Sequence, residues 1–595
     1  MAVRRCTISS VEPYEDGRPF GVVGPYEVVR GVVSCAVDPL APGSQRIVDL
    51  ALAARDASGL VWFDADVVVL RPQDPARAAR TLVYSVANRG SAVALPFSLG
   101  AFAFAGTSDR IVPGDGFLLE RGATVAWSGW QWDVAALPGM VGLRAPEALD
   151  PDGRPIAGPV RMRLAPAADA PTLPLAGTAL VAMQAPFSPA ADAQPDASLT
   201  VRDRPEGEGT VLARASWRFD GESIDLDGGF RGGLLYDVVF RTERCPVVGA
   251  GLLAVRDAVS WLRHGTDADA NPLAGRVDRV CATGASQSGR FLRQFLFDVA
   301  NVDEQGRAVF DGVHVHIAGG RRGEFNCRYG QPGVIWRGPG DEPPYTTDEH
   351  LQPARDAGAA PRVVVTNSAA EYWRGDAWLA HGDAVTGCDL DDPDEVRHYS
   401  LAGVDHVGPL GAQAAMFPAA NPPALLDATP VVRALYVALE QWVRDGVEPP
   451  ASCVPRVDDG TAIPRADALT RLRALPGVVA PDTDALPGHG LGLPALVSEI
   501  DEQGNEVAGI RLPSVAVPVA TFLGWNARPP IEGLPTLMPD FIGSRIAFGH
   551  DPDGPRHGDR GTALRLAADR LVAQRLLLPE DADGVVATAA QEPTG

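Results

Sequence analysis

The sequence predicts an α/β protein with a mostly parallel central sheet, β-rich additions near the N-terminus and a loop-rich C-terminal extension. Between residues 248 and 446, short buried runs alternate with helical patterns, which is typical of parallel strands joined by helices. Residues 1–75 instead hold short apolar runs separated by turns, as antiparallel strands do. After Gly446 the sequence becomes rich in loops, and we expect this part to cap or wrap the core.

The N-terminal part is expected to form antiparallel strands over the runs YEVVRGVVSCAV, RIVDLALAA and LVWFDADVVVL. RTLVYSV, residues 80–86, is a short buried strand followed by the loop NRGSA. ATVAWSG follows as a further strand after a helix end in FLLERG. Proline, alanine and aspartate are frequent between residue 140 and about residue 240, and we interpret this segment as a β-rich insertion.

The α/β part is predicted from a regular alternation of segments. Helices are expected in VGAGLLAVRDAVSWLRHG, SGRFLRQFLFDVA and PVVRALYVALEQWVRDG, and strands in RVDRVCATG, GVHVHIAG, PRVVVTNS and HYSLAG. The chain is therefore divided into five segments. They are an N-terminal β region (1–75), the first part of the core with the oxyanion loop (76–140), the insertion (141–244), the second part of the core with the Ser, Glu and His loops (245–446), and the C-terminal extension (447–595).

The overall composition limits the partners of the chain. Its 595 residues have a formal net charge of −23, so the surface repels nucleic-acid phosphates and anionic membranes, and a neutral small molecule fits better as a substrate. The N-terminus lacks the apolar run of a secretory signal, and no stretch has the length of a membrane span. Seven scattered cysteines without paired spacing favour free thiols and a cytoplasmic location.

The segment GASQSG, residues 284–289, joins a predicted strand directly to a predicted helix. A strand, a sharp turn with a serine between small residues, and a helix are typical of the nucleophile elbow of serine hydrolases. Ser286 has the small neighbours Gly284 and Ser288 two positions away, whereas Ser288 has the bulky Arg290, so we predict Ser286 as the nucleophile. A plain serine-capped helix start and a phosphate-binding loop are the alternatives.

A base and an acid are expected on loops after later strands, in the order serine, acid, histidine. His406 follows the strand HYSLAG within a glycine-flanked loop and is the predicted base. Glu371 follows the strand PRVVVTNS and is the predicted acid, with Asp376 and Asp383 as alternatives on the same loop. His314 and His316 share one face of another strand and are expected to be packing residues or, less plausibly, half of a metal site.

Backbone N–H groups are expected to bind the oxyanion that forms when a serine attacks a carbonyl. One donor is the amide of Gln287, which follows the nucleophile, and the other belongs to Asn88, Arg89 or Gly90 in the loop after an early strand. A simple tight turn is the alternative for this loop. Aromatic and polar residues in four loops are candidates for the substrate pocket: Trp130, Gln131, Trp373, Glu324, Asn326 and Trp525.

Cofactor and metal chemistry are not expected. Zinc motifs are missing from the sequence, and the carboxylates of DLDDPDE lack the spacing of a calcium loop, which favours a solvated acidic loop. Acyl transfer through a serine needs neither a metal nor a cofactor.

Several motifs together resemble one known family. TGASQSGRFLRQFL, FDGVHVHIAGGRRGEFN, NSAAEYWRG and the GVDH segment are similar to those of large bacterial α/β-hydrolase-domain proteins. The similarity extends to FGVVGPYEVVRG near the start and to RLPSVAVPVATFLGWNARPP near the end, so it covers most of the chain. The resemblance implies an α/β-hydrolase fold, a serine ester hydrolase, and Ser286, Glu371 and His406 as its triad, but no particular substrate.

These observations predict hydrolysis of a carboxylic ester of a neutral, hydrophobic small molecule through an acyl-enzyme. Acyl transfer to another acceptor, or lactone or amide cleavage by the same residues, is the alternative within catalysis. A binding protein with a decayed hydrolase site is the alternative outside it. The sequence leaves the oligomeric state open.

Overall fold

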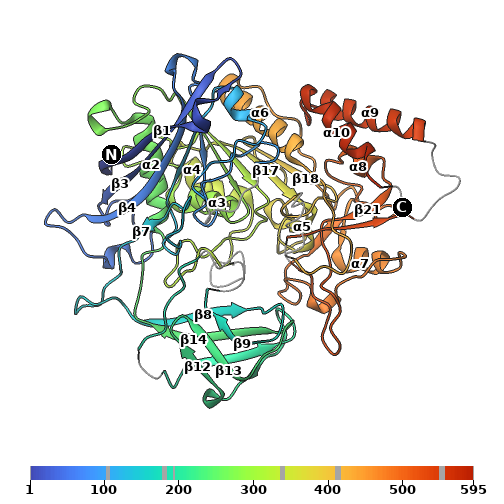
Figure 1. Ribbon diagram of the computed structural model, residues 1–595, viewed down its shortest axis with the longest axis horizontal. Coiled ribbons are helices and arrows are strands. Elements are labelled where there is room, and N and C mark those ends of the chain that lie inside the picture. The colour runs from blue at the N-terminus through green and yellow to red at the C-terminus, as the bar shows by residue number, and fades with distance from the viewer. Residues whose placement is uncertain are drawn as a thin grey trace.

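The chain is described here from a computed structural model, which covers residues 2–101, 108–176, 184–191, 194–334, 342–408, 417–539, 541–548 and 557–593. Eleven strands of this part form the central sheet (Figure 1). They are β1 (Val3–Pro13), β2 (Pro19–Phe20), β3 (Gly24–Val37), β4 (Val61–Pro72), β5 (Thr81–Ser85), β6 (Thr124–Ser128), β7 (Leu143–Arg144), β15 (Arg279–Ala285), β16 (Gly312–His316), β17 (Arg362–Ser368) and β18 (Val396–Leu401).

The central sheet has an antiparallel half and a parallel half. Its order is β1-β3-β4-β6-β5-β15-β16-β17-β18, with β2 paired to β3 and β7 paired to β4. Neighbours from β6 to β18 are parallel, whereas β1, β3 and β4 pair in antiparallel fashion. Parallel strands are covered on both faces and therefore read as continuous apolar runs, as Val363, Val364 and Val365 do in β17.

Six α-helices of the described residues lie before residue 446. They are α1 (Phe117–Glu120), α2 (Ala250–His264), α3 (Gln287–Val299), α4 (Thr347–Asp356), α5 (Ala369–Trp373) and α6 (Thr429–Asp445). α3 contacts α2, α4 and the strands β15 and β16, while α6 packs on β16 and β17. α6 ends at Gly446, whose φ of 72° is the left-handed conformation that favours glycine after a helix.

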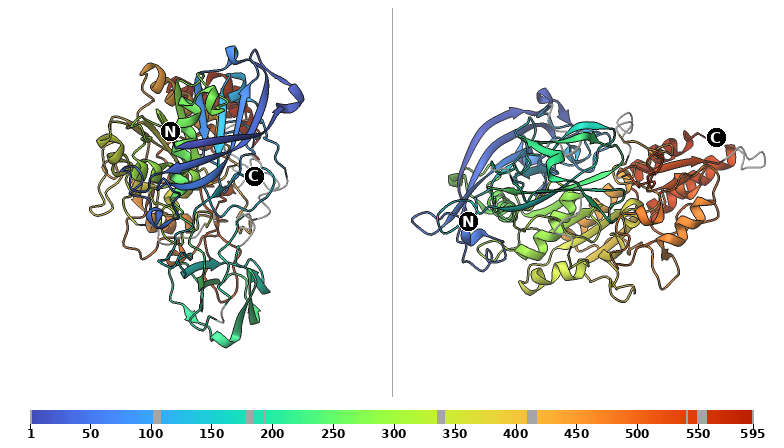
Figure 2. Two further views of the ribbon diagram at one scale, coloured as in Figure 1. Left: turned by 90° about the vertical axis from the view of Figure 1, so that its left-hand side faces the viewer. Right: turned by 90° about the horizontal axis from the view of Figure 1, so that it is seen from below.

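The segment between β7 and α2 builds two small sheets with a core of their own, which includes Phe187, Trp217 and Phe240. Its strands are β8 (Gly158–Leu164), β9 (Ala170–Pro174), β10 (Ser198–Arg202), β11 (Thr210–Val211), β12 (Trp217–Asp220), β13 (Ser223–Phe230) and β14 (Leu235–Thr242). This segment projects from the rest of the molecule in Figure 1 and in the left view of Figure 2.

The segment after α6 consists of short elements joined by long loops. They are β19 (Ala462–Pro464), α7 (Arg465–Arg473), β20 (Leu496–Ser498), α8 (Pro513–Ala516), β21 (Ala520–Leu523), β22 (Ser544–Ala547), α9 (His557–Ala573) and α10 (Ala582–Ala590). They lie at the end of the molecule opposite the N-terminal strands (Figure 2). The boundaries of the five predicted segments remain a prediction.

One predicted strand is wrong. RIVDLALAA, residues 46–54, forms turns and a short 3-10 turn at Leu50–Leu52. Ile47 and Leu50 are buried. The apolar residues of this run therefore pack against the core without forming a strand. Within the described residues, no helix combines the length and the apolar character that crossing a membrane requires.

Candidate active site

Ser286 occupies a strained turn between β15 and α3. Its φ of 57° and ψ of −117° are rarely adopted by a residue with a Cβ atom, and the strand ends and the helix begins on either side of it. Gly284 is required here, because a Cβ at this position would lie 2.5 Å from the carbonyl oxygen of Ser288. Ser288 itself is fully buried inside α3. The structure therefore places Ser286, and not Ser288, at the turn.

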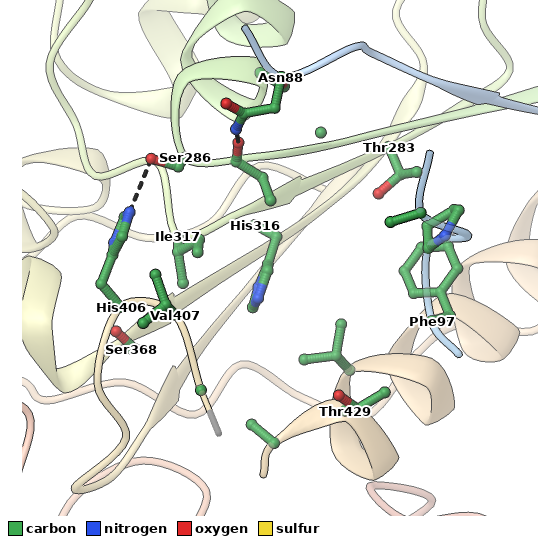
Figure 3. A pocket seen from close by; sticks show the side chains of 18 of the residues that line it. Asn88, Phe97, Thr283, Ser286, His316, Ile317, Ser368, His406, Val407 and Thr429 are labelled. Carbon is green, nitrogen blue, oxygen red and sulfur yellow. Dashed lines mark hydrogen bonds between the residues drawn. The ribbon is translucent and has the colours of Figure 1, made fainter. Parts of the chain in front are cut away.

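The three predicted side chains meet at the carboxyl end of the parallel strands, where Figure 3 shows Ser286 and His406 facing each other. Ser286 Oγ lies 2.8 Å from His406 Nε2, and His406 Nδ1 lies 2.5 Å from Glu371 Oε1. Glu371 belongs to α5 directly after β17, and His406 follows β18, which is the neighbour of β17 in the sheet. Because parallel neighbours end at the same edge, residues far apart in the sequence converge there.

Hydrogen bonds fix which atoms of Glu371, His406 and Ser286 carry protons. Burial alone would raise the pKa of Glu371, but the His406 imidazole, Arg374 and the Ser368 hydroxyl outweigh burial and lower the pKa to about 2. Ser368 donates to Glu371 Oε2 through its backbone N–H at 2.9 Å and its hydroxyl at 2.6 Å. An ionised carboxylate only accepts, so Nδ1 of His406 carries the proton and Nε2 accepts the hydroxyl proton of Ser286.

The predicted oxyanion loop lies beside the turn, since β5 and β15 are neighbours in the sheet. Asn88 Nδ2 donates to the carbonyl oxygen of Ala285 at 2.9 Å. The Arg89 N–H donates to Gln287 Oε1 at 2.9 Å, so this amide is already engaged. Gly90 has a φ of 81° and packs against Val134, which lies 2.5 Å from the position of an added Cβ. Gln287 is the first residue of α3, and backbone N–H groups in the first turn of a helix have no partner within the helix, so this N–H can donate to an anion.

The side chain of Gln287 connects this loop to the nucleophile turn. Besides accepting from Arg89, it donates to Gln131 Oε1 at 3.0 Å and to the Pro332 carbonyl at 2.5 Å. Gln131 in turn donates to the buried carboxylate of Asp133 at 2.7 Å. The amide side chain of Gln287 thus holds the loop in place, while its backbone is the predicted oxyanion donor.

We expect Gln287→Met to lower kcat about 10²-fold with a smaller change in KM. Methionine has a similar volume and keeps the backbone N–H, but it releases the Arg89 amide, and small displacements at a reacting centre have effects of this size. Steady-state kinetics on a p-nitrophenyl ester measure the change. Gln294→Met is the matched control, because Gln294 is a buried amide of the same helix that donates to Asp298. Equal losses in both variants would contradict the role of Gln287.

A cavity of about 440 Å³ opens beside Ser286 and His406. Most of its wall is apolar, which suits a neutral small molecule. The apolar side chains that line it include Leu95, Phe97, Ile317, Val407, Phe417, Val432 and Phe541. These residues were not predicted from the sequence, although the apolar run AVALPF directly after the predicted oxyanion loop was a signal for two of them.

Backbone strain gathers around this cavity. Five residues of its lining have a positive φ although they are not glycine: Arg89, Phe97, Ser286, Ile317 and Phe541. A φ of 43° is especially unfavourable for the β-branched Ile317. Strained residues persist where the surroundings enforce them, and such positions cluster at functional sites.

The six predicted pocket residues lie outside the cavity wall in the part of the chain that the structure describes. Trp130 donates from its indole N–H to the Ala87 carbonyl at 2.7 Å and packs on Phe291 at a tilt, so it supports the predicted oxyanion loop from the core. Gln131 belongs to the buried amide network described above. Trp373 packs on Trp525, with ring centroids 5.4 Å apart, in a core cluster around α5.

The two polar candidates after β16 are also structural. Glu324 accepts from the backbone N–H of Gln331 at 2.9 Å, and burial raises its pKa to about 7. Asn326 bonds the backbone of Arg46 and Val48 at 2.8 Å and 2.9 Å and so anchors the N-terminal loop. The described residues hold no group of three metal-ligating side chains.

The chain was compared with family models, curated proteins and solved structures, and the family model agrees with this architecture. A family model described as an alpha/beta hydrolase domain matches residues 240–587, which is more than half of the chain. Two solved structures of a glucuronoyl esterase from Solibacter usitatus are similar at 11% and 12% identity, with TM-scores of 0.24 and 0.26. They cover 61% and 67% of this chain and 67% and 80% of the esterase chains. No curated protein matches the chain.

Proposed function

Since this chain belongs to the alpha/beta hydrolase domain family, as its fold and motifs predict, we propose that it is a serine ester hydrolase. The observation that supports this most directly is the row of hydrogen bonds from Ser286 Oγ to His406 Nε2 and from Nδ1 to Glu371 Oε1. A serine alcohol becomes nucleophilic when a base accepts its proton, and the base works when an acid fixes its tautomer.

The proposed reaction is acyl transfer in two steps. Ser286 attacks the ester carbonyl while His406 takes its proton, and the Glu371 carboxylate stabilises the imidazolium. The N–H of Gln287 and an amide of the Asn88 loop bind the oxyanion. His406 then gives the proton to the leaving alcohol, and a water molecule activated by the same histidine releases the acid.

The proposed substrate is a neutral, mainly apolar ester. This follows from the apolar lining and from the charged groups among the described wall residues, which are Arg89, Asp405 and Asp427. The guanidinium of Arg89 donates to the Gly333 carbonyl and to Asn88 Oδ1, so its hydrogen-bonding capacity is partly used. Burial raises the pKa of Asp405 to about 7, and its carboxyl oxygens accept from the backbone N–H groups of Gly408 and Gly543, so this group is already engaged by the protein.

We expect a fluorophosphonate probe to label the protein at Ser286 and to inhibit ester hydrolysis in proportion to labelling. An activated serine reacts with such a probe, whereas a decayed site does not. Peptide mass mapping locates the modified residue, and a panel of p-nitrophenyl esters of graded acyl length measures turnover. Labelling elsewhere, or no labelling, would contradict the proposal. Addition of alcohols to the assay separates acyl transfer from hydrolysis.

A further inference from the structure

Two histidines of β16 lie next to the proposed triad and have no part in the mechanism described so far. Both line the cavity, but His314 is fully buried, whereas His316 is partly exposed. Figure 3 shows the His316 side chain extending into the cavity between Ser286 on one side and Phe97 and Thr429 on the other. A polar ring in the middle of an apolar cavity needs a chemical explanation.

Threonines of the neighbouring strands hold both rings in a continuous row. Thr283 Oγ1 lies 3.1 Å from His314 Nδ1, and Thr366 Oγ1 lies 3.1 Å from His314 Nε2. The same Thr366 hydroxyl lies 2.7 Å from His316 Nδ1. Nδ1 of His316 is therefore engaged by the protein, and within the described residues Nε2 is the ring nitrogen left for a ligand.

The hydrogen bonds of these threonines and histidines also determine whether Nε2 of His316 donates or accepts a hydrogen bond. Burial lowers the pKa of His316 to about 4, so the ring is neutral at neutral pH. When Thr366 donates to Nδ1, Nε2 carries the proton and donates; when Thr366 accepts from Nδ1, Nε2 is an acceptor. A hydroxyl group, which donates and accepts, can bond to Nε2 in either arrangement.

A second polar group of the wall lacks a partner. Ser98 follows Phe97, lines the cavity and is 7% exposed, and its hydroxyl has no hydrogen-bond partner among the described residues. A buried hydroxyl without a partner is destabilising, so such a group points to a bound molecule that supplies one. The cavity is thus equipped for an apolar molecule that carries a neutral polar group.

The geometry of the attack indicates which part of the ester reaches His316. In the tetrahedral intermediate, the leaving oxygen must face His406, and the oxyanion must face the amides near Asn88 and Gln287. The acyl substituent takes the remaining direction. In Figure 3, Asn88 and His406 lie on two sides of Ser286, and His316 lies on the third.

We propose that His316 Nε2 hydrogen-bonds a neutral hydroxyl group on the acyl part of the ester, so that the substrates are esters of otherwise apolar hydroxylated acids. This inference rests on the proposed esterase function and defines its substrate class. His316 is a specificity residue in this proposal, because it contacts the substrate away from the reacting atoms.

The test compares p-nitrophenyl 3-phenylpropanoate with its meta- and para-hydroxy analogues. The rigid ring keeps the hydroxyl from attacking its own carbonyl, and the two positions sample two depths of the cavity. The wild-type protein is expected to prefer at least one hydroxylated ester about tenfold or more in kcat/KM. In His316→Phe this ratio falls to about one, and in His316→Gln, which keeps a polar group, most of it is retained. Thermal unfolding verifies that both variants are folded.

A purely structural role of His316 would lower kcat/KM for all three esters in parallel and leave their ratio unchanged, which would overturn the inference. Equal rates for the three esters in the wild-type protein would overturn it too, while leaving the esterase function intact. Dissociation constants of the three esters for Ser286→Ala report the same selectivity without turnover. Selective binding without hydrolysis by the wild-type protein would support the role of His316 and contradict the esterase.

Discussion

Replacing Ser286 with alanine is expected to lower kcat for ester hydrolysis on the order of 10⁶-fold, as loss of a triad serine does in other hydrolases. The variant loses the attacking oxygen, while His406 and Glu371 stay in place. Alanine also keeps the Cβ atom, so the strain of a φ of 57° is unchanged, and we expect little change in the free energy of unfolding. Steady-state kinetics measure the loss of turnover, and mass spectrometry tests for the acyl-enzyme, which should be absent from the variant.

Ser288→Ala is the matched control for this experiment. Ser288 lies two residues away and is also a serine of the same motif, but it is buried in α3 and forms no hydrogen bond to His406 among the contacts described. We expect this variant to keep most of its turnover and to form the acyl-enzyme. If Ser288→Ala were inactive and Ser286→Ala active, the choice between the two serines would be wrong.

The sequence was informative about this site because the relevant constraints are local. A serine in a strained turn needs small neighbours, and Gly284 and Ser288 reveal that need without knowledge of the fold. Glu371 and His406 each follow a run of buried residues that ends in a loop. Parallel strands bring such loops to one edge, so the order of the residues predicts their meeting, which the structure then places within hydrogen-bond distance.

The walls of the cavity were not predictable, because tertiary packing decides them. Trp130 was an attractive pocket candidate by composition, yet its indole turns into the core and bonds the Ala87 carbonyl. Phe541 belongs to the C-terminal segment and still packs on His406, with ring centroids 5.2 Å apart. No local pattern brings this distant residue to the site.

The two histidines of β16 show a similar limit. Their alternation predicts one shared face, and the structure agrees that both contact Thr366. The sequence could not tell that both rings border the cavity, or that one ring is fully buried while the other is partly exposed. The Phe97 ring, which comes from a loop far away in the sequence, packs on His314 at a tilt, with a centroid distance of 5.5 Å.

We expect Glu371→Gln to lower kcat about 10⁴-fold without disturbing the fold, the size of effect seen when the acid of a triad becomes an amide. The reason lies in the contacts of the carboxylate. Ser368 donates two hydrogen bonds to Oε2, one of them from its backbone, so the oxygen of a carboxamide is held on that side and its NH₂ group faces His406 Nδ1. The histidine must then carry its proton on Nε2, where it cannot accept the proton of Ser286. Steady-state kinetics measure the loss.

Glu371→Asp tests the charge of the carboxylate separately from the length of the side chain, because it keeps the charge and shortens the side chain. We expect it to retain more activity than Glu371→Gln. The pKa of about 2 adds an independent readout. A carboxyl with a folded pKa below its usual value of 4.5 stabilises the protein above that value and loses this contribution as the pH falls toward 2. The difference in unfolding free energy between the wild-type protein and Glu371→Gln should therefore narrow on acidification below pH of about 4.5. If the difference in unfolding free energy did not depend on pH, the carboxylate would not be held ionised by His406, Arg374 and Ser368. The assignment of the proton to Nδ1 of His406 would then be unsupported.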